Sequence, residues 1–169
     1  MGLISTISNI ARGQFGFKMN EVMTGQHWFE PGEGPPGPHF MEFRGKWGPD
    51  DVRDWGNPSS DQFMLQDLDG TATVGGLCDD APMKGTLKLD YFGEHKIRYA
   101  FNFEANGTEY QFVGEKVNIK PWNLPFSHTT CFGRLIEAKT KKLVSTSVTF
   151  FKLHTSPKFL GSLRFTQPG

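Results

Sequence analysis

The chain has 169 residues, in which 18 lysines and arginines balance 18 aspartates and glutamates. This length predicts a single domain with a sizeable core. The neutral charge argues against a nucleic-acid binder with a broad basic surface and against a polybasic membrane anchor. The 16 phenylalanines favour strands, and the 20 glycines and 11 prolines favour frequent turns.

Targeting signals are sparse along the chain. No apolar run approaches the roughly 18 residues of a membrane-spanning helix, so stable membrane insertion is not expected. The N-terminus lacks the pattern of a secretory signal, and the two cysteines, Cys78 and Cys131, do not suggest a disulfide framework. A cytoplasmic location is therefore expected. Gly2 fits a loose myristoylation pattern, to which a plain N-terminus is the alternative.

The N-terminal part divides into a leader and a first strand. Residues 1–14 are predicted to be a leader or a short amphipathic helix, because Ile4, Ile7 and Ile10 recur at helical spacing. Residues 15–169 are expected to form one domain. From Phe15 the apolar residues alternate with polar ones, which predicts a strand that ends near Gly25.

The next segment mixes a rigid loop with short elements. Residues 30–38 contain the spacing G-x-G-x-x-G of dinucleotide sites, but two adjacent prolines oppose the helix that this motif must open. A strand is predicted over residues 39–47 and a single helical turn over residues 49–56. Residues 61–74 resemble a strand in which Gly70 predicts a bend, a bulge or a break.

Hairpins dominate the rest of the chain. Alternating runs predict strands over residues 83–91, 96–104 and 109–115, and Asn106-Gly107 is a strong hairpin signal. A last pair is predicted over residues 127–137 and 142–154. Ser156-Pro157 then resembles a helix cap followed by a proline in the first turn.

The predicted architecture is all-β. About eight to ten antiparallel strands with short links must close or fold over to hide their edges. An up-and-down, calycin-like or lipocalin-like β-barrel is the first expectation, and a β-sandwich is the second.

The strand that begins near residue 127 is the first candidate for a site, because neither of its sides is cleanly apolar. His128, Thr130, Phe132 and Arg134 share one side, and Ser127, Thr129, Cys131 and Gly133 share the other. One side must face the inside of a small barrel, where a polar residue needs a hydrogen-bond partner. A satisfied polar network, a ligand contact and catalysis all fit this pattern.

Aromatic residues accumulate on the apolar side of two adjacent strands. They are Tyr99, Phe101, Phe103, Tyr110 and Phe112. These residues form the core of a filled barrel or line the pocket of a hollow one. The sequence favours core for most of them.

Metal and cofactor motifs are absent from the sequence. The five histidines show no spacing typical of zinc ligands, and His128 and Cys131 fall on opposite faces of a strand. No P-loop or nucleophile motif is present. Neither a metal nor a cofactor is therefore predicted.

Several short segments together resemble a known family. They are residues 17–24 followed by Gly25, Gly70, Gly85-Thr86-Leu87 followed by Leu89, Ile97-Arg98-Tyr99, Gly114-Glu115-Lys116-Val117, and a Trp122 loop leading to His128-Thr129-Thr130. This set resembles the lipocalin-like β-domain that accompanies some bacterial cholesterol-oxidase-like flavoproteins of the glucose-methanol-choline class. The resemblance implies a calycin-like barrel and a sterol or lipid context. It implies no flavin chemistry, because the oxidoreductase part is absent. The family has an acidic residue where this chain has His128, so a shared role for this position does not follow from the resemblance.

Three functions follow as hypotheses. The first is a barrel, monomeric or homodimeric, that binds a small apolar or amphipathic molecule such as a lipid, a sterol or a polyketide-like compound. Apolar and edge contacts would come from Tyr99, Tyr110 and Trp122, and the polar head group would be oriented by Lys116, His128 and Thr130.

The alternatives use the same barrel differently. A hydratase or isomerase would use His128 as general acid or base, with Glu115 or Tyr110 as the second group. A non-catalytic interaction module would have a filled barrel and would bind a protein through Trp28, Trp55 or the proline-rich loop.

Overall fold

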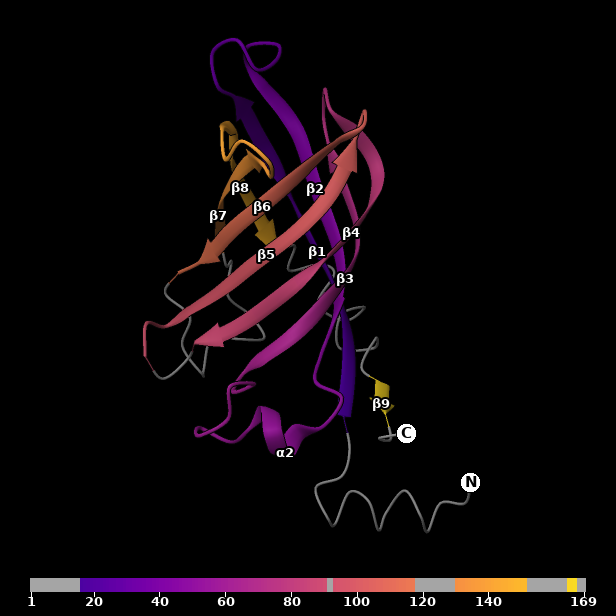
Figure 1. The fold of residues 1–169 in the computed structure, drawn as a ribbon, viewed down its shortest axis with the longest axis vertical. Helices are drawn as coiled ribbons and strands as arrows, with labels where there is room; N and C mark the ends of the chain where they lie inside the picture. Colours follow the sequence, from indigo (N-terminus) through magenta and orange to yellow (C-terminus); the bar gives the residue numbers. More distant parts are fainter. Residues whose placement is uncertain (1–15, 91–92, 118–129, 152–163, 167–169) are drawn as a thin grey trace.

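The computed structural model describes residues 16–90, 93–117, 130–151 and 164–166. These residues form a closed, antiparallel, up-and-down barrel of eight strands, which confirms the predicted fold class (Figure 1). In chain order the elements are β1 (Gly16–Phe29), β2 (Pro38–Trp47), α2 (Val52–Trp55), β3 (Leu65–Val74), β4 (Cys78–Asp90), β5 (Lys96–Ala105), β6 (Thr108–Lys116), β7 (Thr130–Glu137), β8 (Leu143–Phe151) and β9 (Arg164–Thr166).

The long strand β1 closes the barrel by pairing with strands from both ends of the chain. Its Met23 is the register partner of Phe43 on β2 and of Phe151 on β8. The short strand β9, which the sequence did not predict, pairs with the beginning of β1. Among the described residues every barrel strand therefore has a neighbour on both sides, although β1 pairs with β8 only from Met23 onward.

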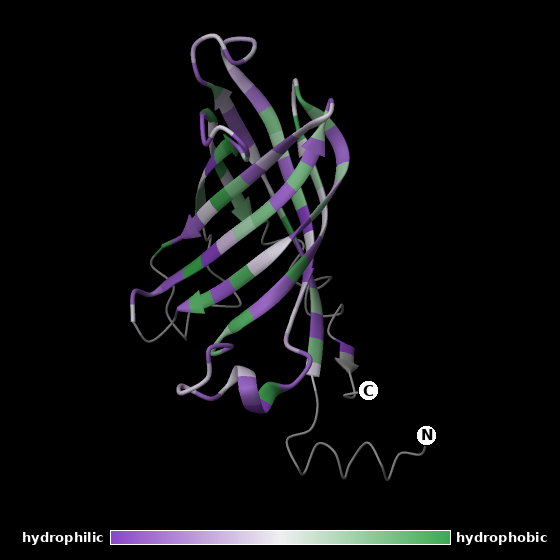
Figure 2. Cartoon of the chain, in the orientation of Figure 1, coloured by the Kyte–Doolittle hydropathy of each residue, from purple (hydrophilic) through white to green (hydrophobic). Residues whose placement is uncertain are grey.

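The barrel has two distinct ends, which we name for their connections. At the α2 end, β1 begins, β6 and β8 end, and α2 lies between β2 and β3 (Figure 1). At the hairpin end, short links join β1 to β2, β3 to β4, β5 to β6 and β7 to β8. Hydrophobic and hydrophilic residues alternate along the strands between these ends (Figure 2).

Aromatic rings fill the middle of the barrel. The ring of Phe43 lies 5.3–5.4 Å, centroid to centroid, from the rings of Tyr99, Phe101 and Phe112. Phe112 lies over Gly114 and Gly133, where an added Cβ would come within 2.7 and 2.3 Å of its ring. These two glycines therefore make room for the Phe112 ring, and most of the predicted aromatic set is core.

Two glycines that the sequence predicts as interruptions lie inside continuous strands. β1 runs past Gly25 to Phe29, so the predicted strand end is wrong. β3 is unbroken at Gly70, and the bulge-type register shift in its pairing with β4 lies between Ala72 and Val74. A Cβ at Gly25 would lie 2.0 Å from the carbonyl oxygen of Val148, and one at Gly70 would lie 1.8 Å from that of Arg44. Glycine occupies these positions because neighbouring backbones approach closely, not because the strand ends.

Local signals in the turns are confirmed. α2 follows Asp51, whose side chain accepts a hydrogen bond of 2.9 Å from the backbone N–H of Arg53. Asn106 and Gly107 have φ values of 54° and 76°, as a tight hairpin turn requires. The predicted N-terminal leader and the helix start at Ser156-Pro157 lie outside the described residues.

None of the helices in the described parts of the chain has the length and apolar character needed to cross a membrane.

Candidate functional site

An ion pair lies inside the barrel near its α2 end. Glu21 on β1 and Lys116 on β6 face each other across the interior, and the Lys116 ammonium donates a hydrogen bond to Oε1 of Glu21. Their side chains are only 7% and 4% exposed. Both charges are therefore removed from water, which is costly unless each has a partner.

Two aromatic side chains complete the hydrogen bonds of the Glu21 carboxylate. The Tyr99 hydroxyl lies 3.1 Å from Oε1 and 3.0 Å from Oε2, and the indole N–H of Trp47 donates to Oε2 over 3.1 Å. Four strands thus supply one polar cluster, which consists of Glu21, Trp47, Tyr99 and Lys116.

The Lys116 ammonium has more hydrogen-bond donors than acceptors within its reach in the described parts of the chain. It carries three N–H donors, and Glu21 is its one hydrogen-bond acceptor among the described residues. The nitrogen also lies 5.2 Å from the ring centroid of Tyr99 and 5.5 Å from that of Phe151. These rings stabilise the cation through their π-faces. Lys116 therefore has N–H donors without an acceptor among the described residues, and two aromatic rings lie next to its ammonium.

The thiol next to this cluster, that of Cys131, is unreactive. Cys131 is fully buried on β7 and is the register partner of Lys116. Burial raises the pKa of the Cys131 thiol to about 12, although the Lys116 charge and the Thr149 side chain oppose the rise. The thiol is therefore protonated at neutral pH and is no nucleophile, because thiolates are the reactive form.

The structure gathers two of the six residues that the sequence proposed as ligand contacts. Tyr99 and Lys116 lie together in the polar cluster. Tyr110 lies at the opposite, hairpin end of β6 and stacks on Phe103. Thr130 shares the outward side of β7 with the exposed Phe132, so it does not face the interior beside Lys116. Trp122 and His128 lie outside the described residues.

Sequence reasoning missed Glu21 and Trp47. Glu21 has a recognisable signal, because it is the acidic residue on the side of its strand that also carries Phe17, Met19 and Met23. Lys116 has the same signal, since it falls in phase with Phe112 and Gly114. A charge on the apolar side of a strand predicts a buried charge and hence a partner.

A second polar region lies at the hairpin end. His27 and Ser147 are register partners on β1 and β8, and both are buried. His27 Nε2 lies 2.9 Å from the Gly75 carbonyl oxygen, whereas His27 Nδ1 and Ser147 Oγ have no hydrogen-bond partner among the described residues. Burial lowers the pKa of His27, so the imidazole is neutral at neutral pH. This end of the barrel therefore holds two buried polar atoms without a partner among the described residues.

Metal ligands do not cluster in the described parts of the chain. No group of three or more histidine, cysteine, aspartate or glutamate residues in them is arranged to hold a metal ion.

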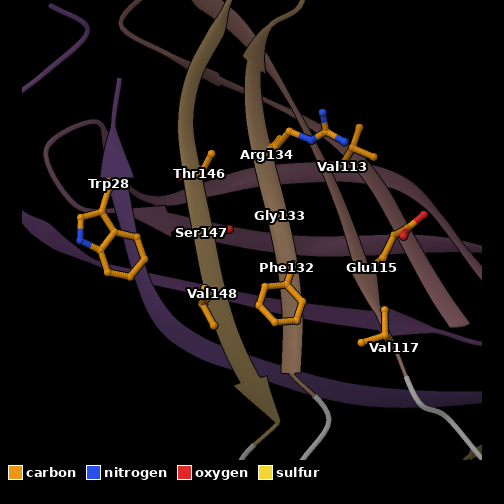
Figure 3. Close-up of a pocket in the computed structure, with 10 residues that line it drawn as sticks. All are labelled: Trp28, Val113, Glu115, Val117, Phe132, Gly133, Arg134, Thr146, Ser147 and Val148. Carbon is orange, nitrogen blue, oxygen red and sulfur yellow. The ribbon is translucent and has the colours of Figure 1, made fainter. Parts of the chain in front are cut away.

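The outer wall of the barrel carries a groove of about 490 Å³ (Figure 3). Its apolar lining comprises Trp28, Val113, Val117, Phe132 and Val148, which come from β1, from β6 and the residue after it, and from β7 and β8. Glu115 and Arg134 add opposite charges to the same surface. We call this feature the outer groove.

Comparison with known proteins gives no relative: no family model, no curated protein and no solved structure matches the chain. The resemblance to the lipocalin-like domain of cholesterol-oxidase-like proteins therefore stays a prediction.

Proposed function

We propose that this chain is a binding protein whose barrel takes a small amphipathic molecule at its α2 end. The observation that carries the proposal is the buried Lys116 ammonium, which has three donors and one acceptor among the described residues. A buried ion pair is seldom more stabilising than apolar residues of similar volume, so a purely structural role explains it poorly. Apolar walls with a few polar groups are typical of sites for small molecules.

The polar cluster favours a neutral ligand. Glu21 and Lys116 neutralise each other, so a charged ligand would leave one charge without a partner in a site that excludes water. A hydroxyl or carbonyl group can accept a hydrogen bond from Lys116 without adding charge. The apolar part of such a molecule would contact the rings of Tyr99 and Phe151. This chemistry fits the lipid, sterol or polyketide-like class expected from the sequence.

Fluorescence anisotropy and native mass spectrometry test the proposal with two probes, pyrene-labelled dodecanol and pyrene-labelled dodecanoic acid. We expect the alcohol to bind more tightly than the acid. The double variant Glu21→Leu with Lys116→Met removes both charges, so it should keep the fold and should weaken alcohol binding about tenfold or more.

Tyr110→Phe is the matched control for this experiment, because Tyr110 lies on the same strand as Lys116 but at the hairpin end. It should bind the alcohol as the unmodified chain does. Absence of binding by both probes, or unchanged alcohol affinity in the double variant, would contradict the proposal.

A non-catalytic interaction module is the second candidate. It is favoured by the aromatic rings that fill the middle of the barrel and by the exposed apolar residues on its outer wall. The hydratase or isomerase hypothesis depends on His128, outside the described residues, and stays a prediction.

A further inference from the structure

Four side chains on two neighbouring strands form the centre of the outer groove. Val113 and Glu115 come from β6, and Phe132 and Arg134 come from β7. Val113 is the register partner of Arg134, and Glu115 is that of Phe132. The two apolar residues therefore occupy one diagonal of this block, and the two opposite charges occupy the other (Figure 3).

The apolar members of the block are open to solvent. Phe132 is 54% exposed and Val113 is 43% exposed, and Trp28 on β1 continues the apolar surface. Single exposed apolar residues are ordinary, but a contiguous apolar groove with a charged border is typical of an interaction surface.

The charges of the block are available for a partner. Arg134 forms no ion pair with any described residue. Glu115 lies 3.2 Å from Arg98 Nε and 3.5 Å from Lys96 Nζ, and its side chain is still 39% exposed. Its carboxylate can accept further hydrogen bonds, because two oxygens provide about four acceptor positions.

The diagonal arrangement is self-complementary. In a dimer with twofold symmetry, the same patch on both copies must fit itself. Consider a twofold axis that lies in the interface along the Val113–Phe132 diagonal. It places Val113 of one copy opposite Val113 of the other, and Phe132 opposite Phe132. The same rotation exchanges the ends of the other diagonal, so Arg134 of each copy faces Glu115 of the other. Two equivalent ion pairs then flank an apolar centre.

We propose that the outer groove is the interface of a homodimer in which the β6–β7 faces of two barrels pack against each other. The occupant of the groove is a second copy of this chain, selected by the charge pattern of the block. The neutral net charge of the chain adds no long-range repulsion between copies. This interface is on the outer wall and does not depend on the proposed ligand site inside the barrel.

Analytical ultracentrifugation across about 1 µM to 1 mM protein tests the proposal. The unmodified chain should shift from monomer to dimer within this range, and Phe132→Ser should keep it monomeric. Phe40→Ser is the matched control, because Phe40 on β2 is 51% exposed and does not line the groove. A chain that stays monomeric throughout, or a control that dissociates as Phe132→Ser does, overturns the proposal.

Charge variants test the predicted pairing directly. Arg134→Glu places two acidic residues together at both ends of the interface and should raise the dimer dissociation constant about tenfold or more. Arg134→Gln removes the attraction without adding repulsion, so its effect should be smaller. Arg44→Glu on β2 is the control reversal and should leave dimerisation unchanged. A dimer that withstands both Phe132→Ser and Arg134→Glu uses another surface and overturns the proposal.

Discussion

Strands β6 and β7 have an inside face and an outside face that depart from the usual pattern in opposite ways. Inside, Lys116 is a buried charge with 3% exposure, and outside, Phe132 is an aromatic residue with 54% exposure. Small barrels commonly do the reverse, with apolar residues inside and polar residues outside. The buried charge of Lys116 is paired with Glu21, whereas no part of the described chain covers the exposed ring of Phe132. Substitutions should therefore affect folding on one face and association on the other.

The largest expected effect comes from breaking the interior ion pair on one side only. Glu21→Leu leaves the Lys116 ammonium buried without its carboxylate partner and should reduce the free energy of unfolding by about 3–5 kcal/mol. The double variant with Lys116→Met removes both charges and should lose much less. Urea denaturation measures both. If the single and double variants are equally stable, the two charges do not depend on each other.

A smaller loss should follow from adding one carbon atom to the inside face of β7. In Gly133→Ala the new Cβ would lie about 2.3 Å from the Phe112 ring and 2.6 Å from Ser147 Oγ, so the core must shift. Overpacking of this kind costs about 1–3 kcal/mol. Combining it with Phe112→Leu should recover part of the loss in the same urea experiment. Equal stability of Gly133→Ala and the unmodified chain would show that Phe112 does not occupy this space.

The hairpin end should respond to pH through His27. Burial lowers the pKa of His27 in the folded chain below the 6.5 of a free histidine side chain, so acid favours the unfolded state. The stability that depends on neutral His27 is fully present above the pKa that His27 has in the unfolded chain. It is lost as the pH falls from there toward the lower pKa of the folded chain. His27→Leu should therefore reduce the pH dependence of unfolding between about pH 7 and pH 5. His95→Gln is the control, because His95 is exposed in the link between β4 and β5 at the α2 end. Equal slopes for His27→Leu and the unmodified chain would contradict the assignment.

The smallest effect on folding is expected on the outside face. Phe132→Ser should change the free energy of unfolding of the monomer by no more than about 0.5 kcal/mol, because the side chain is exposed and contacts little of the core. Urea denaturation at low protein concentration measures this value. A loss as large as that of Gly133→Ala would mean that the two faces of β7 contribute equally to stability.

The barrel was predictable because its signals are local. Alternation and turn residues specify each hairpin, and Asn106-Gly107 is the clearest case. The sequence marks Gly25 and Gly70 as interruptions, whereas the role of each glycine depends on the backbone of the neighbouring strand, at Val148 and at Arg44. That approach arises only when the sheet coils into a barrel, and no single strand encodes it.

The candidate site was only partly predictable for a similar reason. Lys116 and Tyr99 could be proposed from their strands, but their common partner Glu21 is 95 residues away from Lys116 and 78 from Tyr99. The facing of β7 was ambiguous in the sequence, since both of its sides mix polar and apolar residues. The structure turns Cys131 and Gly133 inward and Phe132 and Arg134 outward. Thr130 shares the outward side with Phe132 and Arg134.

The buried thiol of Cys131 can serve as a probe of how often the barrel opens. A reagent that reacts only with thiolates can modify Cys131 only after β7 separates from its neighbours, because the folded thiol is covered and protonated. In a Cys78→Ser background, the labelling rate would thus report how often the wall between the polar cluster and β8 opens. Any molecule that binds beside Lys116 and stabilises the closed barrel would slow this rate, whatever its identity.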